Sequence, residues 1–138
     1  MTEYPRRDVS RSSDGFTLRR NQLAWADGCL ELTVDDVTSP FPKAVRGQVK
    51  VFPAGFNPRA FSLDDHERHV WWPIAPTARV EVQLSGARWS GRAYLDSNWG
   101  VEPLERGFSG WNWSRSSMPS STVIHYITED HQGGQRAL

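Results

Sequence analysis

The stretch Ala78-Arg79-Val80-Glu81-Val82-Gln83-Leu84-Ser85 decides the fold class, because apolar and polar residues alternate along it. Successive side chains of a β-strand point to opposite faces, so this alternation is typical of a strand with one buried face. The pattern recurs at residues 30–35, 45–51 and 123–128, and turn dipeptides such as Ser85-Gly86 separate the runs. No segment has a convincing helical period. We therefore predict an all-β, antiparallel barrel or sandwich.

The length of 138 residues predicts one domain. Residues 1–14 are polar and are predicted to form a flexible N-terminal segment. Residues 15–130 are predicted to form the folded domain, with a long loop over residues 52–68. Residues 131–138 are predicted to be a flexible tail.

Charge and apolar content exclude several classes of partner and location. Sixteen Lys and Arg residues balance sixteen Asp and Glu residues, so no net field favours binding to nucleic acid. The first thirty residues lack the apolar core of a signal peptide, and no stretch approaches the roughly 20 apolar residues of a membrane span. These features predict a cytoplasmic location. Cys29 is the single cysteine and is predicted to be a buried structural residue.

Residues 94–116 are the second informative region, because tryptophans alternate there with ionisable and polar side chains. Trp99, Trp111 and Trp113 lie within little more than twenty residues of Tyr94 and Asp96. A plain core avoids ionisable groups, whereas a small-molecule site combines apolar walls with a few placed polar groups. This composition predicts a ligand pocket.

Strand geometry pairs the candidate chemical groups. Tyr94 and Asp96 are two residues apart in an extended run, so both side chains point to one face. His69 and Trp71 have the same spacing, and Pro73 is predicted to end strand pairing or to lie at an edge. If both segments line one cavity, it holds an acid, a phenol, an imidazole and an indole, which can transfer protons without a cofactor.

Other interpretations of these residues remain open at this stage. Asp96 could close a turn, and Tyr94 could be a core residue with its hydroxyl at the rim. His66 and His69 have a His-x-x-His spacing, but no third ligand has diagnostic spacing, so no metal ion is predicted and His66 is expected on a surface loop. Arg92 and Arg115 could form structural ion pairs.

Three blocks of the sequence resemble the carotenoid 1,2-hydratase family, also called hydroxyneurosporene synthase. The blocks are His69-x-Trp71-x-Pro73-Ile74-Ala75-Pro76-x-Ala78-Arg79-Val80-Glu81-Val82, Trp89-x-Gly91-x-Ala93-Tyr94-Leu95-Asp96-Ser97-Asn98-Trp99-Gly100 and Pro103-Leu104-Glu105-x-x-Phe108-x-x-Trp111-x-Trp113-Ser114-Arg115. The resemblance implies a lipocalin-like β-barrel or sandwich. Because full family members are longer, it also implies a shortened or partial member with an incomplete barrel.

The family adds water to the terminal C1–C2 double bond of acyclic carotenoids such as neurosporene and lycopene, without a cofactor. The resemblance implies catalytic roles for four residues: Asp96 as general acid, Tyr94 as its orienting group, Trp71 facing the cation, and His69 holding water or tuning Asp96. Residues of the same region are expected to bind substrate. These are Trp99, Trp111, Trp113, Arg92 and Arg115.

The implied partners are an acyclic carotenoid and water, and the substrate implies peripheral contact with the inner face of a bacterial membrane. Phe52, Phe56 and Trp72 are candidate contact residues. An apolar-ligand binding module or an inactive fragment is the alternative, distinguished by whether Asp96 is buried or lies exposed in a turn. A glycan-binding jelly roll is a third class, favoured if Trp71, Trp99 and Trp111 lie on the outer surface. The sequence does not indicate an oligomeric state.

Overall fold

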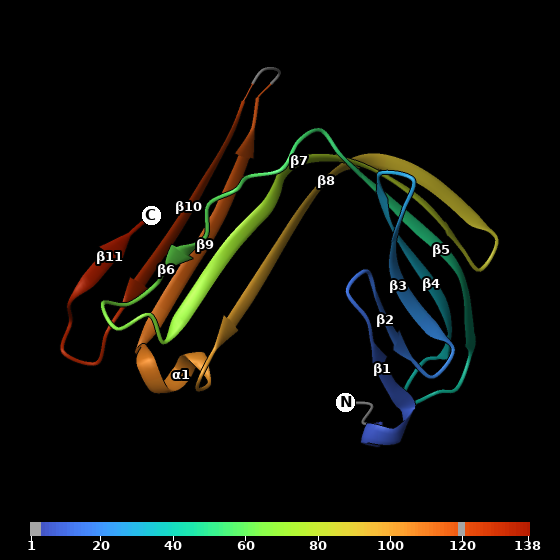
Figure 1. Ribbon diagram of the computed structural model, residues 1–138, viewed down its shortest axis with the longest axis horizontal. Coiled ribbons are helices and arrows are strands. Elements are labelled where there is room, and N and C mark those ends of the chain that lie inside the picture. The colour runs from blue at the N-terminus through green and yellow to red at the C-terminus, as the bar shows by residue number, and fades with distance from the viewer. Residues whose placement is uncertain (1–3, 119–120) are drawn as a thin grey trace. The chain divides into compact units, whose positions relative to one another are not determined.

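The computed structural model describes residues 4–118 and 121–138, which form antiparallel strands with two very short helices (Figure 1). The predicted all-β antiparallel class is confirmed, and the described strands form no closed barrel. The elements, in chain order, are η1 (Arg6–Asp8), β1 (Val9–Arg11), β2 (Gly15–Leu18), β3 (Asn21–Ala26), β4 (Cys29–Val37), β5 (Ala44–Pro53), β6 (Phe61–Ser62), β7 (His69–Leu84), β8 (Ala87–Gly100), α1 (Leu104–Gly107), β9 (Gly110–Ser117), β10 (Thr122–Glu129) and β11 (Gln135–Ala137).

The chain divides into two compact units, and β7 and β8 each contribute to both. The first unit holds the described residues up to Ala54 together with Ala78–Ala93. The second unit holds Gly55–Thr77 and Tyr94 to the C-terminus. The single domain predicted over residues 15–130 is therefore distributed over two units.

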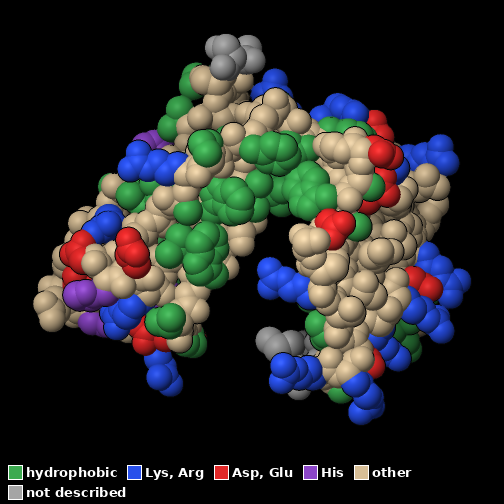
Figure 2. Space-filling view, in the orientation of Figure 1, with side chains coloured by type: hydrophobic (Ala, Val, Ile, Leu, Met, Phe, Trp, Pro, Cys, Tyr) green, Lys and Arg blue, Asp and Glu red, His purple; other side chains and the backbone are tan. Residues whose placement is uncertain are grey.

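The first unit is an antiparallel sheet in which β1 to β5 follow one another and β5 pairs with β7. The register aligns Leu32 with Val49 and Val49 with Val82, so the predicted alternation gathers aliphatic side chains on one face. Polar side chains gather on the other face, where Lys50 Nζ lies 2.6 Å from Glu31 Oε1. Figure 2 shows acidic and basic side chains interspersed over the surface of this unit. Cys29 is buried, as predicted, and burial raises the pKa of its thiol.

The second unit contains the clearest hydrophobic core of the described residues. Leu63, Trp71, Phe108 and Tyr126 are buried against one another. Tyr126 belongs to the antiparallel sheet of β9, β10 and β11, and the register places it opposite Trp113. The single-turn helix α1 lies between β8 and β9 and precedes Phe108, so the core draws on several elements of this unit (Figure 1).

Strand β7 changes the face that it buries along its length. His69, Trp71, Pro73 and Ala75 are buried at odd positions, whereas the buried residues after Thr77 are Ala78 and Val82 at even positions. Pro73 lies within the strand, between the residues that pair with β6 and those that pair with β5. A proline has no N–H to donate, so this interval suits it.

Both ends predicted to be flexible contain short strands. β1 pairs with β2, with Val9 opposite Leu18, and β11 pairs with β10. The backbone of Leu138 also exchanges two hydrogen bonds with Tyr126. Residues 1–3 of the predicted N-terminal segment lie outside the described residues. Backbone hydrogen bonds hold these strands, and they form whatever the side chains are. A polar sequence therefore gives no sign of them.

The predicted loop over residues 52–68 is mostly irregular, although Phe52 and Pro53 belong to β5 and Phe61–Ser62 form β6. Among the described residues, no helix has the length and apolar character needed to cross a membrane.

Gly47 offers a test of the β5–β7 register. A Cβ built at Gly47 would lie 1.8 Å from the Gln83 carbonyl oxygen, which is backbone and cannot rotate away. We expect Gly47→Ala to lower the free energy of unfolding by about 1–3 kcal/mol or more, measured by chemical denaturation. Gly91→Ala is the matched control, because nothing lies within 4 Å of its Cβ position. Equal effects of the two substitutions would contradict the register.

Candidate functional site

Trp71, Tyr94 and Asp96 form one hydrogen-bonded group inside the second unit. Trp71 Nε1–H is shared between Tyr94 Oη and Asp96 Oδ2, each at 3.1 Å. Tyr94 Oη–H donates to Asp96 Oδ2 at 3.2 Å. Trp71 comes from β7 and the other two side chains come from β8, so neighbouring strands supply the group. The spacing argument from the sequence put Tyr94 and Asp96 on one face, and the hydrogen bond between them agrees with this.

Asp96 receives all of its described hydrogen bonds on a single oxygen. Asn98 Nδ2 donates to Oδ2 at 3.4 Å, in addition to the Trp71 and Tyr94 donors. Asp96 is half-buried within β8, so the interpretation of Asp96 as a turn residue is wrong. The sequence analysis did not select Asn98, although its position two residues after Asp96 on the same strand face could have indicated it.

Tyr94 is held from several sides. Its ring packs against the Trp113 ring at 5.2 Å, and the Arg115 guanidinium lies over it at 5.5 Å. Burial raises the pKa of the Tyr94 phenol, the Trp71 hydrogen bond opposes this, and the charge of Asp96 raises it further. The phenol therefore stays protonated and acts as a donor toward Asp96.

Trp71 is buried at 3% exposure, with the Phe61 ring 5.6 Å away and the Tyr126 ring 5.3 Å away. The Trp71 ring is therefore packed among core side chains, and its indole N–H is the group that contacts Tyr94 and Asp96. The expected role of Trp71 as a surface that faces a cation does not match this burial. Trp113 is 40% exposed and packs on Tyr94, which makes it the more accessible indole of this site.

His69 lies in a separate group. It is buried at 3% exposure, and its Nδ1 lies 3.0 Å from Asp64 Oδ2. Its ring packs against Phe108 at 5.0 Å. No hydrogen bond joins His69 to Trp71, Tyr94 or Asp96 in residues 4–118 and 121–138. Sequence reasoning missed Asp64, for which the only local signal was the acidic turn composition of residues 64–68.

The residues expected to bind substrate are dispersed. Trp113 and Arg115 contact Tyr94, as described above. Trp99 and Trp111 are each 50% exposed and make no ring stack or hydrogen bond with the Trp71–Tyr94–Asp96 group within the described residues. Arg92 is exposed on β8 and belongs to the first unit.

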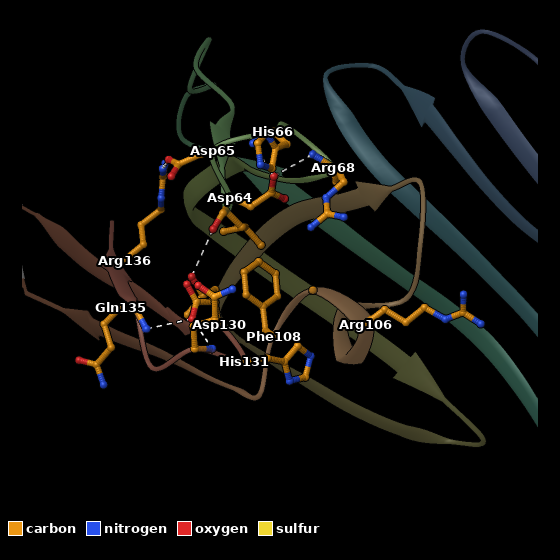
Figure 3. A pocket seen from close by; sticks show the side chains of 15 residues that line it. Asp64, Asp65, His66, Arg68, Arg106, Phe108, Asp130, His131, Gln135 and Arg136 are labelled. Carbon is orange, nitrogen blue, oxygen red and sulfur yellow. Dashed lines mark hydrogen bonds and ion pairs between the residues drawn. The ribbon is translucent and has the colours of Figure 1, made fainter.

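A polar cavity of about 600 Å³ also lies in the second unit (Figure 3). None of the nine predicted site residues lines it. Two of its basic side chains are paired: Arg136 with Asp65, which also lines the cavity, and Arg68 with Glu102, which does not, its Nη1 lying 3.2 Å from Glu102 Oε1. Asp64 and Phe108 line it and also contact His69. His66 is exposed at this cavity, as expected for a surface loop, and no metal-binding cluster of three His, Cys, Asp or Glu residues occurs in the described chain.

The shared Trp71 hydrogen bond predicts a stability cost when its donor is removed. Trp71→Phe leaves Tyr94 Oη and Asp96 Oδ2 without this donor and removes ring volume from the core. We expect the free energy of unfolding to fall by about 1–3 kcal/mol from the loss of this hydrogen bond to a charged group, because only the Tyr94 and Asn98 donors then remain on Asp96 Oδ2. Trp99→Phe, at a half-exposed site, should change it by less than about 0.5 kcal/mol in the same denaturation experiment. A Trp71→Phe protein as stable as the wild type would contradict the geometry.

The Asp64 carboxylate predicts a pH dependence of stability. Burial tends to raise its pKa, but hydrogen bonds from Arg68, His69 and His66 outweigh this and lower it. A carboxyl whose pKa is lowered by folding stabilises the fold above its unfolded pKa of about 3.9, and that contribution is lost as the pH falls through the folded value. The stability difference between wild type and Asp64→Asn, measured by denaturation from pH 7 downward, should therefore shrink below about pH 4. A constant difference would disprove this contribution.

Comparison with known proteins identifies relatives along the whole chain. An acyclic carotenoid 1,2-hydratase of Thiocapsa roseopersicina is 46% identical over 137 residues, covering 97% of this chain and 34% of the relative. The acyclic carotenoid 1,2-hydratase of Rubrivivax gelatinosus is 43% identical over 141 residues, covering 100% of this chain and 35% of the relative. The acyclic carotenoid 1,2-hydratase of Cereibacter sphaeroides is 32% identical over 140 residues, covering 100% of this chain and 50% of the relative.

The chain thus spans about a third to a half of the length of these curated relatives. No solved structure matches it. Residues 1–138 match the family described as Carotenoid hydratase CrtC. The match covers the three blocks that carry His69, Trp71, Tyr94 and Asp96, and the chain belongs to this carotenoid hydratase family.

Proposed function

We propose that this chain carries the catalytic group of an acyclic carotenoid hydratase, which adds water to a terminal C1–C2 double bond to give a tertiary alcohol. The observation that supports the proposal is the Trp71–Tyr94–Asp96 hydrogen-bonded group, combined with membership of the hydratase family. The names of the relatives supply the substrate class, an acyclic carotenoid. Water is the co-reactant.

Asp96 is the proposed general acid. An isolated alkene is a weak base, so hydration begins when a proton is delivered to C2. Three donors converge on Asp96 Oδ2, so a carboxylic acid proton belongs on the other oxygen, Oδ1. The Tyr94 and Trp71 donors fix the carboxyl plane and direct Oδ1–H toward the substrate. The alkene electron pair forms the new C2–H bond, and Asp96 becomes a carboxylate.

The proton transfer leaves a tertiary cation at C1. An electron-rich aromatic face stabilises such a cation by roughly 1–2 kcal/mol or more once water is excluded. We assign this role to Trp113, because it packs on Tyr94 at 5.2 Å and remains 40% exposed. Trp71 instead keeps its donor role.

Water completes the cycle. Its oxygen attacks C1 to form the C–O bond, and the proton it loses returns to the Asp96 carboxylate. Every atom and electron of the addition is then accounted for by the alkene and one water molecule. The cycle therefore needs no further reactant, and Asp96 ends in its starting form.

Binding of an apolar ligand without chemistry is the second candidate. The half-exposed Trp99 and Trp111 favour it, because exposed indoles offer apolar contact area outside the hydrogen-bonded group. The glycan-binding class is disfavoured, since Trp71 is buried. For either apolar role the chain must reach a substrate dissolved in a membrane, and we propose peripheral contact at the cytoplasmic face. Phe56, at 62% exposure, is the most exposed of the three candidate contact residues, whereas Phe52 and Trp72 are half-buried.

The decisive experiment incubates the purified chain with lycopene in detergent micelles, without added cofactors, and measures the product by liquid chromatography and mass spectrometry. We expect a product heavier than lycopene by one water. Asp96→Asn keeps the shape of the side chain but removes the acid, so it should lower the rate at least about 100-fold. Glu105→Gln, an exposed substitution on α1 with the same charge change, is the matched control and should keep full activity.

The outcomes separate the two candidates. Undiminished hydration by the Asp96→Asn protein would disprove the assignment of the general acid. Lycopene binding is measured by quenching of tryptophan fluorescence. A folded wild-type chain that binds lycopene but forms no product would favour the binding module. A full-length relative run in parallel verifies that the substrate is accessible in the micelles.

A further inference from the structure

We infer that Asp64 is a positioning residue that holds His69 in one tautomer, with the proton on Nδ1 and a bare lone pair on Nε2. The role of His69 toward water rests on the proposed function, whereas the tautomer itself does not. Nothing in the sequence pattern pairs these two residues, and the inference comes from the geometry of the second unit.

The Asp64 carboxylate accepts four hydrogen bonds, two on each oxygen. Its Oδ1 accepts the backbone N–H groups of His66 at 2.8 Å and Arg68 at 3.2 Å. Its Oδ2 accepts the backbone N–H of His69 at 2.8 Å and lies 3.0 Å from His69 Nδ1. The carboxylate therefore fixes the backbone and the imidazole of His69 with the same oxygen.

The donor pattern assigns the tautomer. An ionised carboxylate only accepts hydrogen bonds, so the proton between Asp64 Oδ2 and His69 must be on Nδ1. His69 Nε2 is buried and has no hydrogen-bond partner among the described residues. A proton on Nε2 would therefore be an unpaired buried donor, which costs about 1–3 kcal/mol. Both observations place the lone pair on Nε2.

The ring of His69 is closely enclosed by its surroundings. A Cβ at Gly107 would lie 2.5 Å from His69 Cε1, and one at Gly100 would lie 3.1 Å from Cδ2. The Phe108 ring packs 5.0 Å away. Two glycines thus leave room for the imidazole, and among the described residues Asp64 supplies the polar contact that orients it. Held in this way, the Nε2 lone pair has one fixed direction, and a water molecule admitted to this buried nitrogen would donate to it and have its oxygen oriented.

Asp64→Asn is a sharp test because an amide cannot replace this carboxylate in either orientation. Each carboxylate oxygen faces two N–H donors, so the Asn NH2 group would meet donors whichever way it turns. Asp65→Asn is the matched control. It is the adjacent acid with the same charge change, its side chain is 82% exposed, and it pairs with Arg136 and not with His69.

The tautomer is measured by ¹⁵N–¹H correlation spectra of the imidazole rings of the wild-type chain. The chain has four histidines, and the His69 signals are identified by their loss in His69→Gln. We expect a protonated-nitrogen shift at Nδ1 and a bare-nitrogen shift at Nε2, unchanged in Asp65→Asn. A wild-type His69 with its proton on Nε2, or a fast-averaged mixture, overturns the inference. This result does not depend on hydratase activity or on the folding of Asp64→Asn.

The lycopene assay tests the catalytic consequence. We expect Asp64→Asn to lower kcat by about 10–100-fold with KM nearly unchanged, because a misplaced group affects the reacting geometry more than substrate binding. Asp65→Asn should keep the wild-type kcat. A folded Asp64→Asn protein with wild-type kcat would overturn the positioning role. If the wild-type chain forms no product, the proposed function fails while the spectra still decide the tautomer.

Discussion

The indole N–H of Trp71, shared between Tyr94 Oη and Asp96 Oδ2, is the interaction on which the second unit depends. The same side chain that makes this hydrogen bond packs with Leu63, Phe108 and Tyr126 in the core. The polar group is therefore anchored to the best-buried part of the unit. The role that we propose for Asp96, protonation of an alkene, needs a fixed direction, which an anchor on a flexible loop would not supply.

Short-range periodicity accounts for what could be predicted from the sequence. The strands follow from two-residue alternation, and the same rule places Tyr94 beside Asp96 because a strand fixes the face of every second residue. Hydrogen bonding of this pair to Trp71 required the pairing of β7 with β8, which the alternation alone does not specify. The grouping of His69 with Asp64 follows from an irregular turn over residues 64–68. Such a turn has no period to detect, so the contact between His69 and Asp64 could not be predicted from the sequence.

Exposure was the other property that the sequence could not supply. Trp71, Trp99 and Trp111 have the same side chain, yet the first is buried and the other two are half exposed. Trp71 lies on the buried face of β7, whereas Trp99 on β8 and Trp111 on β9 lie in runs of exposed residues, and in β7 the buried face changes at Thr77 within one unbroken strand. A pattern rule that assumes one buried face per strand therefore fails at that position. The strands β1 and β11, which lie in the segments predicted to be flexible, could not be predicted for a related reason, since their backbone pairing leaves no hydrophobic signal in the sequence.

Asp64 and Asp96 of the second unit differ in how many hydrogen bonds each of their oxygens accepts, and this difference supports the roles that we propose for them. Asp64 accepts two hydrogen bonds on each oxygen, so a proton on either one would displace a donor. It is suited to remain a carboxylate and to orient His69. Asp96 accepts its described bonds on Oδ2 alone, so Oδ1 can carry a proton and release it without disturbing the Tyr94 and Trp71 donors. A catalytic acid must change its protonation state in every turnover, whereas a positioning group must not. The donor geometry therefore separates the two roles for residues of the same type.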